Sequence, residues 1–214
     1  MRQQWEGEGP LIEKHPTSAL GLRAHKGGAI LVALTLDNRQ PRLLLNTLLA
    51  THADGDRLTR EPYHAARDLP RTADGRAAAE ALVAEARRRQ DQLAHANLQS
   101  VLQRLDPKPA TAALLVNRAG WVTGLLDYSL EFPEHAAVAE PLAVREALRF
   151  ALRQCGLASI ELDEKSLPDG AAAILRSSPA EIDATLKSLG TAAGKPWRRE
   201  QKLAALAAWV ALAK

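Results

Sequence analysis

The sequence predicts an α/β domain in which one mixed sheet, opened by a β-hairpin, carries helices on both faces. Two observations lead to this prediction. First, 29–36 is an almost unbroken apolar run, which is typical of a strand covered on both faces. Second, helix-like and strand-like patterns alternate along the rest of the chain, as they do where helices connect the parallel strands of a sheet.

A short turn joins this strand to a second predicted strand at 43–49. The turn is Asp37-Asn-Arg-Gln-Pro41, in which Asp and Asn tolerate unusual backbone angles and Pro removes a hydrogen-bond donor. Two strands with so short a connection form an antiparallel hairpin. Before the hairpin, 1–26 has no clear period and is broken by glycine and proline. We therefore predict an N-terminal extension over 1–26 and a domain over 27–214.

Beyond the hairpin, two helices are each followed by a strand. Apolar residues recur at helical spacing from 75 to 105 and again from 138 to 155. The apolar segments 112–116 and 159–163 come next after these helices. Because neighbouring parallel strands need a crossover connection, we expect 112–116 and 159–163 to be parallel strands of the same sheet. A final helix is predicted over 198–213.

The composition excludes several classes of protein. The net charge of +3 is compatible with a nucleic-acid partner without pointing to one. The single cysteine, Cys155, rules out an internal disulfide and a cysteine-based zinc site, and its place on an apolar helix face favours a buried thiol. No apolar run has the roughly 18–20 residues of a membrane span, and the N-terminus lacks the apolar core of a signal peptide. We expect a cytoplasmic protein without membrane contact.

Two adjacent carboxylates, Asp163 and Glu164, stand where the last predicted strand ends. Open α/β sheets bind ligands beyond the carboxyl ends of their strands, so this pair is the first candidate for chemistry. In that interpretation, Asp163 is the metal ligand. The alternative is structural: a solvent-facing pair, or an N-cap of the helix that follows.

At this strand end the sequence also resembles the ribonuclease H-like superfamily. Leu162-Asp-Glu-Lys-Ser-Leu167, followed by Gly170-Ala-Ala-Ala-Ile-Leu175, is similar to the strand end and small-residue helix of YqgF, or Holliday-junction-resolvase-like, proteins. Ala143-Val-Arg-Glu-Ala-Leu-Arg-Phe-Ala-Leu152 and the Ala-rich final helix resemble the helices at those places in the family. Ala139-Glu140 and the strand end also look like plant-type ribonuclease H. The resemblance covers most of 27–213 and implies the hairpin-led ribonuclease H-like sheet.

The resemblance implies a metal-dependent nuclease or resolvase that acts on structured RNA or DNA. Such enzymes use two Mg²⁺ or Mn²⁺ ions, held by converging carboxylates, to clamp the attacking water and the leaving oxygen. The catalytic candidates are Asp163, Glu164, Glu140, which matches only the plant-type pattern, and Asp37. Glu140 is alternatively a first-turn acid favoured by the helix macrodipole, and Asp37 a turn residue.

The acidic set departs from the family pattern. The position of the first-strand Asp falls at Thr35, and 203–206, where the final helix should carry an acid, has none. Glu200 is the nearest acid, about one helical turn earlier. These departures favour an alternative function, a catalytically inactive member that binds nucleic acid or a protein partner without cleavage.

One basic cluster accompanies an aromatic residue near the start of the final helix. Its members are Lys195, Trp197, Arg198, Arg199 and Lys202. The indole could stack on a base while the cations bind phosphates. Alternatively, Trp197 packs on the core at the helix start, which is the interpretation we favour.

Overall fold

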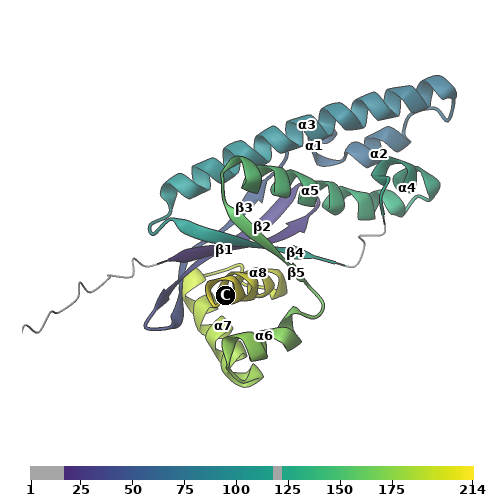
Figure 1. Ribbon diagram of the computed structural model, residues 1–214. Coiled ribbons are helices and arrows are strands. Elements are labelled where there is room, and N and C mark those ends of the chain that lie inside the picture. Colours follow the sequence, from purple (N-terminus) through teal and green to yellow (C-terminus); the bar gives the residue numbers. More distant parts are fainter. Residues whose placement is uncertain (1–16, 118–121) are drawn as a thin grey trace, which may run out of the picture.

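The computed structural model describes residues 17–117 and 122–214, and its strands form one mixed five-stranded sheet (Figure 1). Along the sheet the order is β3-β2-β1-β4-β5. The first three strands form an antiparallel meander, whereas β1, β4 and β5 are parallel. The strands are β1 (Ser18–His25), β2 (Gly28–Asp37), β3 (Gln40–Ala50), β4 (Pro109–Val116) and β5 (Ala158–Asp163).

Helices cover both faces of the sheet (Figure 1). They are α1 (Arg57–Arg60), α2 (Pro62–Arg67), α3 (Ala73–Arg104), α4 (Leu125–Glu131), α5 (His135–Gln154), α6 (Leu167–Leu175), α7 (Pro179–Ala193) and α8 (Arg199–Leu212). Figure 1 shows α3 and α5 above the sheet and α6, α7 and α8 below it. The long helix α3 runs past the sheet, and α2 and α4 pack with α3 and α5 at that end.

Alternation along the strands builds one core on each face. Ala19, Val32 and Leu115 belong to the core between the sheet and α8. Leu20 and Leu114 belong to the opposite core, which α3 and α5 complete. Burial on both faces explains why the predicted apolar runs are almost continuous. The predicted strands therefore all lie in one sheet, with β4 and β5 parallel, as expected.

The predicted boundary at residue 26 is wrong for 18–25, because this segment is β1 at the centre of the sheet. It pairs with β2 on one side and β4 on the other. The strand lacks a full apolar signal because Gly21 lies against α8: a Cβ there would be 1.8 Å from the carbonyl oxygen of Ala204. Its carboxyl half carries Arg23 and His25. Residues 1–16 of the predicted extension lie outside the described part.

Three helices lie in segments between the elements predicted above. The helices α1 and α2 lie between β3 and α3, and α4 lies between β4 and α5. Residues 118–121 lie outside the described part of the chain. Cys155 is half-buried at the end of α5, and burial raises the pKa of its thiol. Within the described chain, every helix is too short or too polar to cross a membrane.

Candidate functional site

A cavity of about 490 Å³ lies at the carboxyl ends of the parallel strands β1, β4 and β5. These ends meet at one edge of the sheet, where ligands bind in open α/β folds. Side chains from α5, the start of α6 and the start of α8 complete the wall. We call this cavity the strand-end pocket; it is lined by Arg23, Ala24, His25, Lys26, Asn117, Ala137, Pro141, Arg145, Glu164, Lys165, Pro168 and Arg199.

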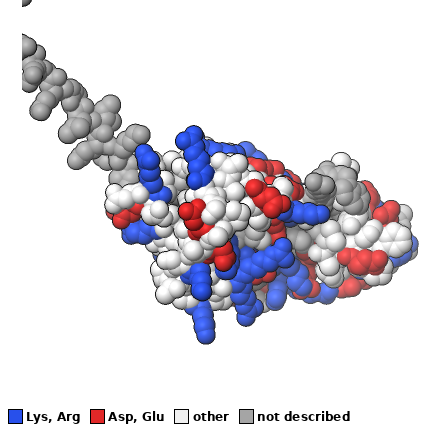
Figure 2. Space-filling view, turned by 90° about the horizontal axis from the view of Figure 1, so that it is seen from below, with Lys and Arg blue, Asp and Glu red and all other residues white. Residues whose placement is uncertain are grey.

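The strand-end pocket is strongly basic. Five of its lining residues are Lys or Arg. Among the lining residues that the structure describes, Glu164 is the one acidic residue. Figure 2 shows that the face over α6, α7 and α8 is less uniform, since acidic side chains lie beside the basic ones there. A concave wall of one sign focuses the field and attracts ligands of the opposite charge.

Glu164 neutralises Arg23 inside the pocket. Nε and Nη2 of Arg23 donate to the same Glu164 oxygen, Oε1, at 3.1 and 2.9 Å. The exposed fractions of the two side chains are 25% and 21%, so water screens the pair in part. The backbone N–H of Glu164 donates to the Val116 carbonyl at 2.8 Å, which fixes the acid beside β4. Lys26 is paired with Glu61 at 3.0 Å.

Arg145 is the pocket's buried cation. It is only 7% exposed, and its Nη1 donates to Asn117 Oδ1 at 2.6 Å. Its Nε has no hydrogen-bond partner within the described chain. Burial lowers the pKa of Arg145, but a guanidinium stays charged in proteins. A buried, incompletely satisfied cation is costly unless an anion compensates it.

Asp163 has a structural role at the end of β5. Its Oδ1 accepts hydrogen bonds from the backbone N–H and from the hydroxyl of Ser166, both at 2.9 Å. Ser166 directly precedes α6, so the carboxylate stabilises the turn into this helix. Asp163 is not among the residues that line the strand-end pocket.

Glu140 and Asp37 lie away from the pocket lining. Glu140 is 1% exposed, and its Oε1 accepts from the backbone N–H groups of Tyr63 and His64 at 3.0 and 3.2 Å, at the start of α2. Burial raises the pKa of Glu140, while the hydrogen bonds from His64 and Tyr63 oppose that rise. Asp37 ends β2 at the opposite edge of the sheet, where the hairpin turns.

The predicted acids therefore do not form a metal site with one another in this structure. Among the described residues, no three His, Cys, Asp or Glu side chains gather so as to hold a metal ion. Because Ser18–His25 is the first strand of the sheet, Thr35 lies in the second strand and not in the first. Its hydroxyl donates to the Thr17 carbonyl. The true first strand, Ser18–His25, contains no acid, and ends in Arg23 and His25.

The residues of the predicted basic cluster have different places in the structure: Trp197 packs on a helix, and Arg199 lines the strand-end pocket. Trp197 Nε1 donates to the Leu186 carbonyl at 2.9 Å, and a Cβ on Gly190 would lie 2.3 Å from the indole ring. Trp197 thus packs on α7, as the favoured interpretation held. Lys202 lies 3.5 Å from Asp183, while Arg199 lines the strand-end pocket. Lys195 and Arg198 are exposed outside its lining.

Sequence reasoning missed four pocket cations, Arg23, Lys26, Arg145 and Lys165. Two of them had a signal. Arg145 stands among buried residues on the apolar face of α5, and a charged residue in such a position usually has a specific partner. Arg23 interrupts an otherwise apolar strand. Lys26 and Lys165 have no such signal because each lies in an ordinary polar turn.

No protein-family model and no curated protein sequence matches the chain. Solved structures match its fold. RuvC of Thermus thermophilus in complex with a Holliday junction substrate aligns with a TM-score of 0.53 at 11% identity, covering 91% of this chain and 92% of that one. A second Thermus thermophilus RuvC structure gives 0.51 at 13% identity with the same coverage.

The yeast mitochondrial Holliday junction resolvase Ydc2 aligns at 11% identity with a TM-score of 0.42, over 94% of this chain and 84% of its own. The two RuvC structures share their fold with almost the whole chain. The predicted class is thereby confirmed: this is a ribonuclease H-like α/β fold with a hairpin-led mixed sheet. At these identities the likeness concerns the fold, and the family-level resemblances to YqgF and plant-type ribonuclease H stay predictions.

Proposed function

We propose that this protein binds structured nucleic acid through phosphate contacts in the strand-end pocket, without metal-dependent cleavage. One observation carries the proposal: Arg145 is a buried cation with an unsatisfied Nε, in a pocket to which Lys165 and Arg199 add charge. Arginine and lysine are the side chains that recognise phosphate. A phosphodiester oxygen in the pocket would compensate the buried guanidinium.

The donor set argues against the nuclease that the resemblance implies. Mg²⁺ and Mn²⁺ need oxygen ligands with negative charge, and two-metal hydrolysis needs several carboxylates that converge. At the strand ends the described lining offers Glu164, which Arg23 already neutralises. The neighbouring cations would repel a divalent ion. The residues present therefore suit an anion and do not fit the metal pair.

The fold supports a nucleic acid as the source of that anion. One of the matching structures is a RuvC in complex with a Holliday junction substrate. The substrate of that complex is a branched DNA, and 92% of the RuvC chain aligns with this one. We therefore take a four-way DNA junction as the first probe, with duplex DNA and duplex RNA beside it.

Fluorescence anisotropy of labelled probes across a salt series tests the proposal. Affinity should fall steeply with salt because each phosphate contact releases counterions, with a slope of roughly −0.9 per contact in log K against log salt. Lys165→Ala and Arg199→Ala should each weaken binding and make the slope shallower by about one. Arg104→Ala, at the exposed end of α3, is the matched control and should change neither.

Three outcomes would overturn the proposal. The first is no binding at low salt, and the second is an affinity indifferent to salt. The third is an equal loss in the Arg104→Ala control, which would indicate diffuse surface charge. The same probes incubated with millimolar Mg²⁺ or Mn²⁺ should stay intact. Metal-dependent cleavage that Asp163→Asn abolishes would restore the nuclease interpretation.

A further inference from the structure

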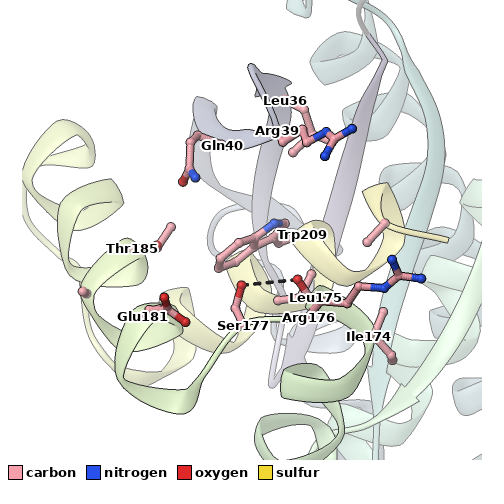
Figure 3. Close-up of a pocket in the computed structure, with 12 residues that line it drawn as sticks. Leu36, Arg39, Gln40, Ile174, Leu175, Arg176, Ser177, Glu181, Thr185 and Trp209 are labelled. Atoms are coloured by element: carbon pink, nitrogen blue, oxygen red, sulfur yellow. Dashed lines mark hydrogen bonds between the residues drawn. The ribbon is translucent and has the colours of Figure 1, made fainter.

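A second cavity lies at the other end of the sheet, beside the carboxyl end of α8. Its volume is about 670 Å³, within the range of small-molecule sites. Figure 3 shows its walls, which come from the β2–β3 turn, α7 and the ends of α6 and α8. We call it the Trp209 pocket; it is lined by Leu36, Arg39, Gln40, Ile174, Leu175, Arg176, Ser177, Glu181, Ala184, Thr185, Trp209 and Ala213.

Two arginines on the pocket wall have no partner within the described chain. Arg39 belongs to the hairpin turn and Arg176 ends α6, and both are exposed. Neither guanidinium makes a hydrogen bond or ion pair with a described residue. In Figure 3 both lie to one side of Trp209, with Glu181 on the other side. Two free guanidiniums beside one cavity make a receptor for an anion.

Both arginines also occupy backbone positions that favour glycine. The φ angle is +68° at Arg39 and +51° at Arg176. Among the described non-glycine residues, Asn38 alone shares this left-handed region, at +49°. A side chain there costs free energy that glycine would save. Arg39 takes the second position of the two-residue turn between Asp37 and Gln40, and Arg176 is the C-cap of α6, so glycine can replace either arginine and keep the local backbone.

The rest of the pocket suits a ring rather than a bare ion. Trp209 is 7% exposed and, with Leu36 and Leu175, supplies an apolar wall. Gln40 and Thr185 add polar groups. Glu181 does not neutralise the arginines, since its Oε2 accepts from the backbone N–H and hydroxyl of Ser178 at 2.7 and 2.8 Å. The acid is engaged in capping α7.

We propose that the Trp209 pocket binds a phosphorylated nucleoside. Arg39 and Arg176 would take the phosphate, and the wall around Trp209 would contact the base. The polar groups of Gln40 and Thr185 would meet the sugar or the base edge. The same chemistry is offered by a free nucleotide and by the 5′-phosphorylated end of a strand. This site is separate from the strand-end pocket, because α8 (Arg199–Leu212) has its start at the strand-end pocket and its end at the Trp209 pocket.

Isothermal titration of the full chain with AMP at low salt tests the proposal. We expect AMP to bind more tightly than adenosine, inorganic phosphate or ribose 5-phosphate, each of which has only part of the recognised chemistry. Arg39→Gly and Arg176→Gly should each weaken AMP binding by about 10–100-fold, as expected for a lost charge-assisted hydrogen bond. Both variants should melt at or above the wild-type temperature, because glycine relieves the left-handed backbone.

Asn38→Gly is the matched control, since it relaxes the same turn and keeps both arginines. It should bind AMP within about twofold of the wild type, as should the strand-end variant Arg199→Ala. Oligonucleotides with and without a 5′ phosphate, titrated in that Arg199→Ala background, distinguish a strand end from a free nucleotide. The proposal is overturned if AMP does not bind, or if Arg39→Gly and Arg176→Gly bind it like the wild type.

Discussion

Arg23 and Glu164 determine how much positive charge the strand-end pocket offers to a ligand. Both donor atoms of Arg23 that face Glu164 use one carboxylate oxygen, so the acid occupies the place that a phosphate oxygen could take. The pair is partly exposed, and such pairs contribute about 0–1 kcal/mol to stability. Glu164 is therefore better understood as a competitor for Arg23 than as a source of stability.

Glu164→Gln should tighten nucleic-acid binding. Removing one negative charge about 4 Å from a phosphate is worth about 1 kcal/mol in a water-like dielectric, or roughly fivefold in affinity. Glu80→Gln is the control, because this exposed acid in α3 pairs with Arg76 and does not line the pocket. Anisotropy titrations of both variants decide the matter. Weaker binding by Glu164→Gln would mean that the acid contributes to the ligand site.

Glu140 makes the fold sensitive to pH. Burial raises the pKa of this carboxyl above its ordinary value of 4.5, although the hydrogen bonds from His64 and Tyr63 oppose the rise. The folded chain thus keeps the proton to a higher pH than the unfolded chain does. Stability should fall as pH rises from about 4.5 to the raised pKa, with a limiting slope of about 1.4 kcal/mol per pH unit.

In Glu140→Gln this fall should disappear, because the amide cannot ionise but its oxygen can still accept from the start of α2. Urea unfolding of both proteins from acidic to neutral pH measures the difference. The free energy of unfolding of the variant should increase relative to that of the wild type as pH rises. Glu134→Gln, at an exposed acid just before α5, should follow the wild-type curve. If the Glu140→Gln and wild-type curves stay parallel throughout, ionisation of Glu140 does not change the stability of the fold, and the prediction is wrong.

At the scale of elements, the contact between β1 and α8 sets how closely the lower layer approaches the sheet. Gly21 faces the backbone of α8, and Ala204 and Ala208 face Gly21. Small residues on both elements allow this approach. The same packing carries Arg199, at the start of α8, to the strand-end pocket and Trp209, near its end, to the second pocket.

Gly21→Ala should destabilise the fold strongly. The added Cβ would meet the Ala204 carbonyl oxygen at 1.8 Å, so α8 must move away from the sheet. Overpacking of this kind costs roughly 1–3 kcal/mol or more. Gly170→Ala in α6 has open space around the new Cβ and should instead gain about 0.5–1 kcal/mol in helix propensity. Denaturant midpoints for the two variants should move in opposite directions; a harmless Gly21→Ala would contradict the close approach.

How well an element was predicted depends on how local its signal is. The amphipathic stripes of α3 and α5 are local, so their predicted ranges differ from the observed ones by a few residues. The sequence did not predict β1 because Gly21 and Arg23 contact residues far along the chain. Gly21 packs against Ala204, and Arg23 pairs with Glu164. At the strand end, the sequence shows Asp163 and Glu164 side by side but not their partners. In the structure Asp163 accepts from Ser166, three residues on, whereas Glu164 pairs with Arg23 of the distant strand β1.

At the scale of the whole molecule, β1 connects two halves of the sheet. On one side lies the antiparallel meander with β2 and β3, and on the other lie the parallel strands β4 and β5. The strand also belongs to both cores, through Ala19 on the face covered by α8 and Leu20 on the face covered by α5. Its carboxyl end supplies Arg23 to the strand-end pocket. Fold and proposed site thus depend on a segment that local patterns place outside the domain.

Truncation tests this dependence. A chain of residues 27–214 lacks β1 and should not fold, because β2 and β4 would each lose a paired edge and both cores would lose their central strand. A chain of residues 17–214 keeps every described contact and should melt cooperatively. Circular dichroism melts and size-exclusion chromatography compare the two. A cooperative melt of 27–214 with native secondary structure would show that the domain can form without β1, and would restore the boundary that the sequence predicts.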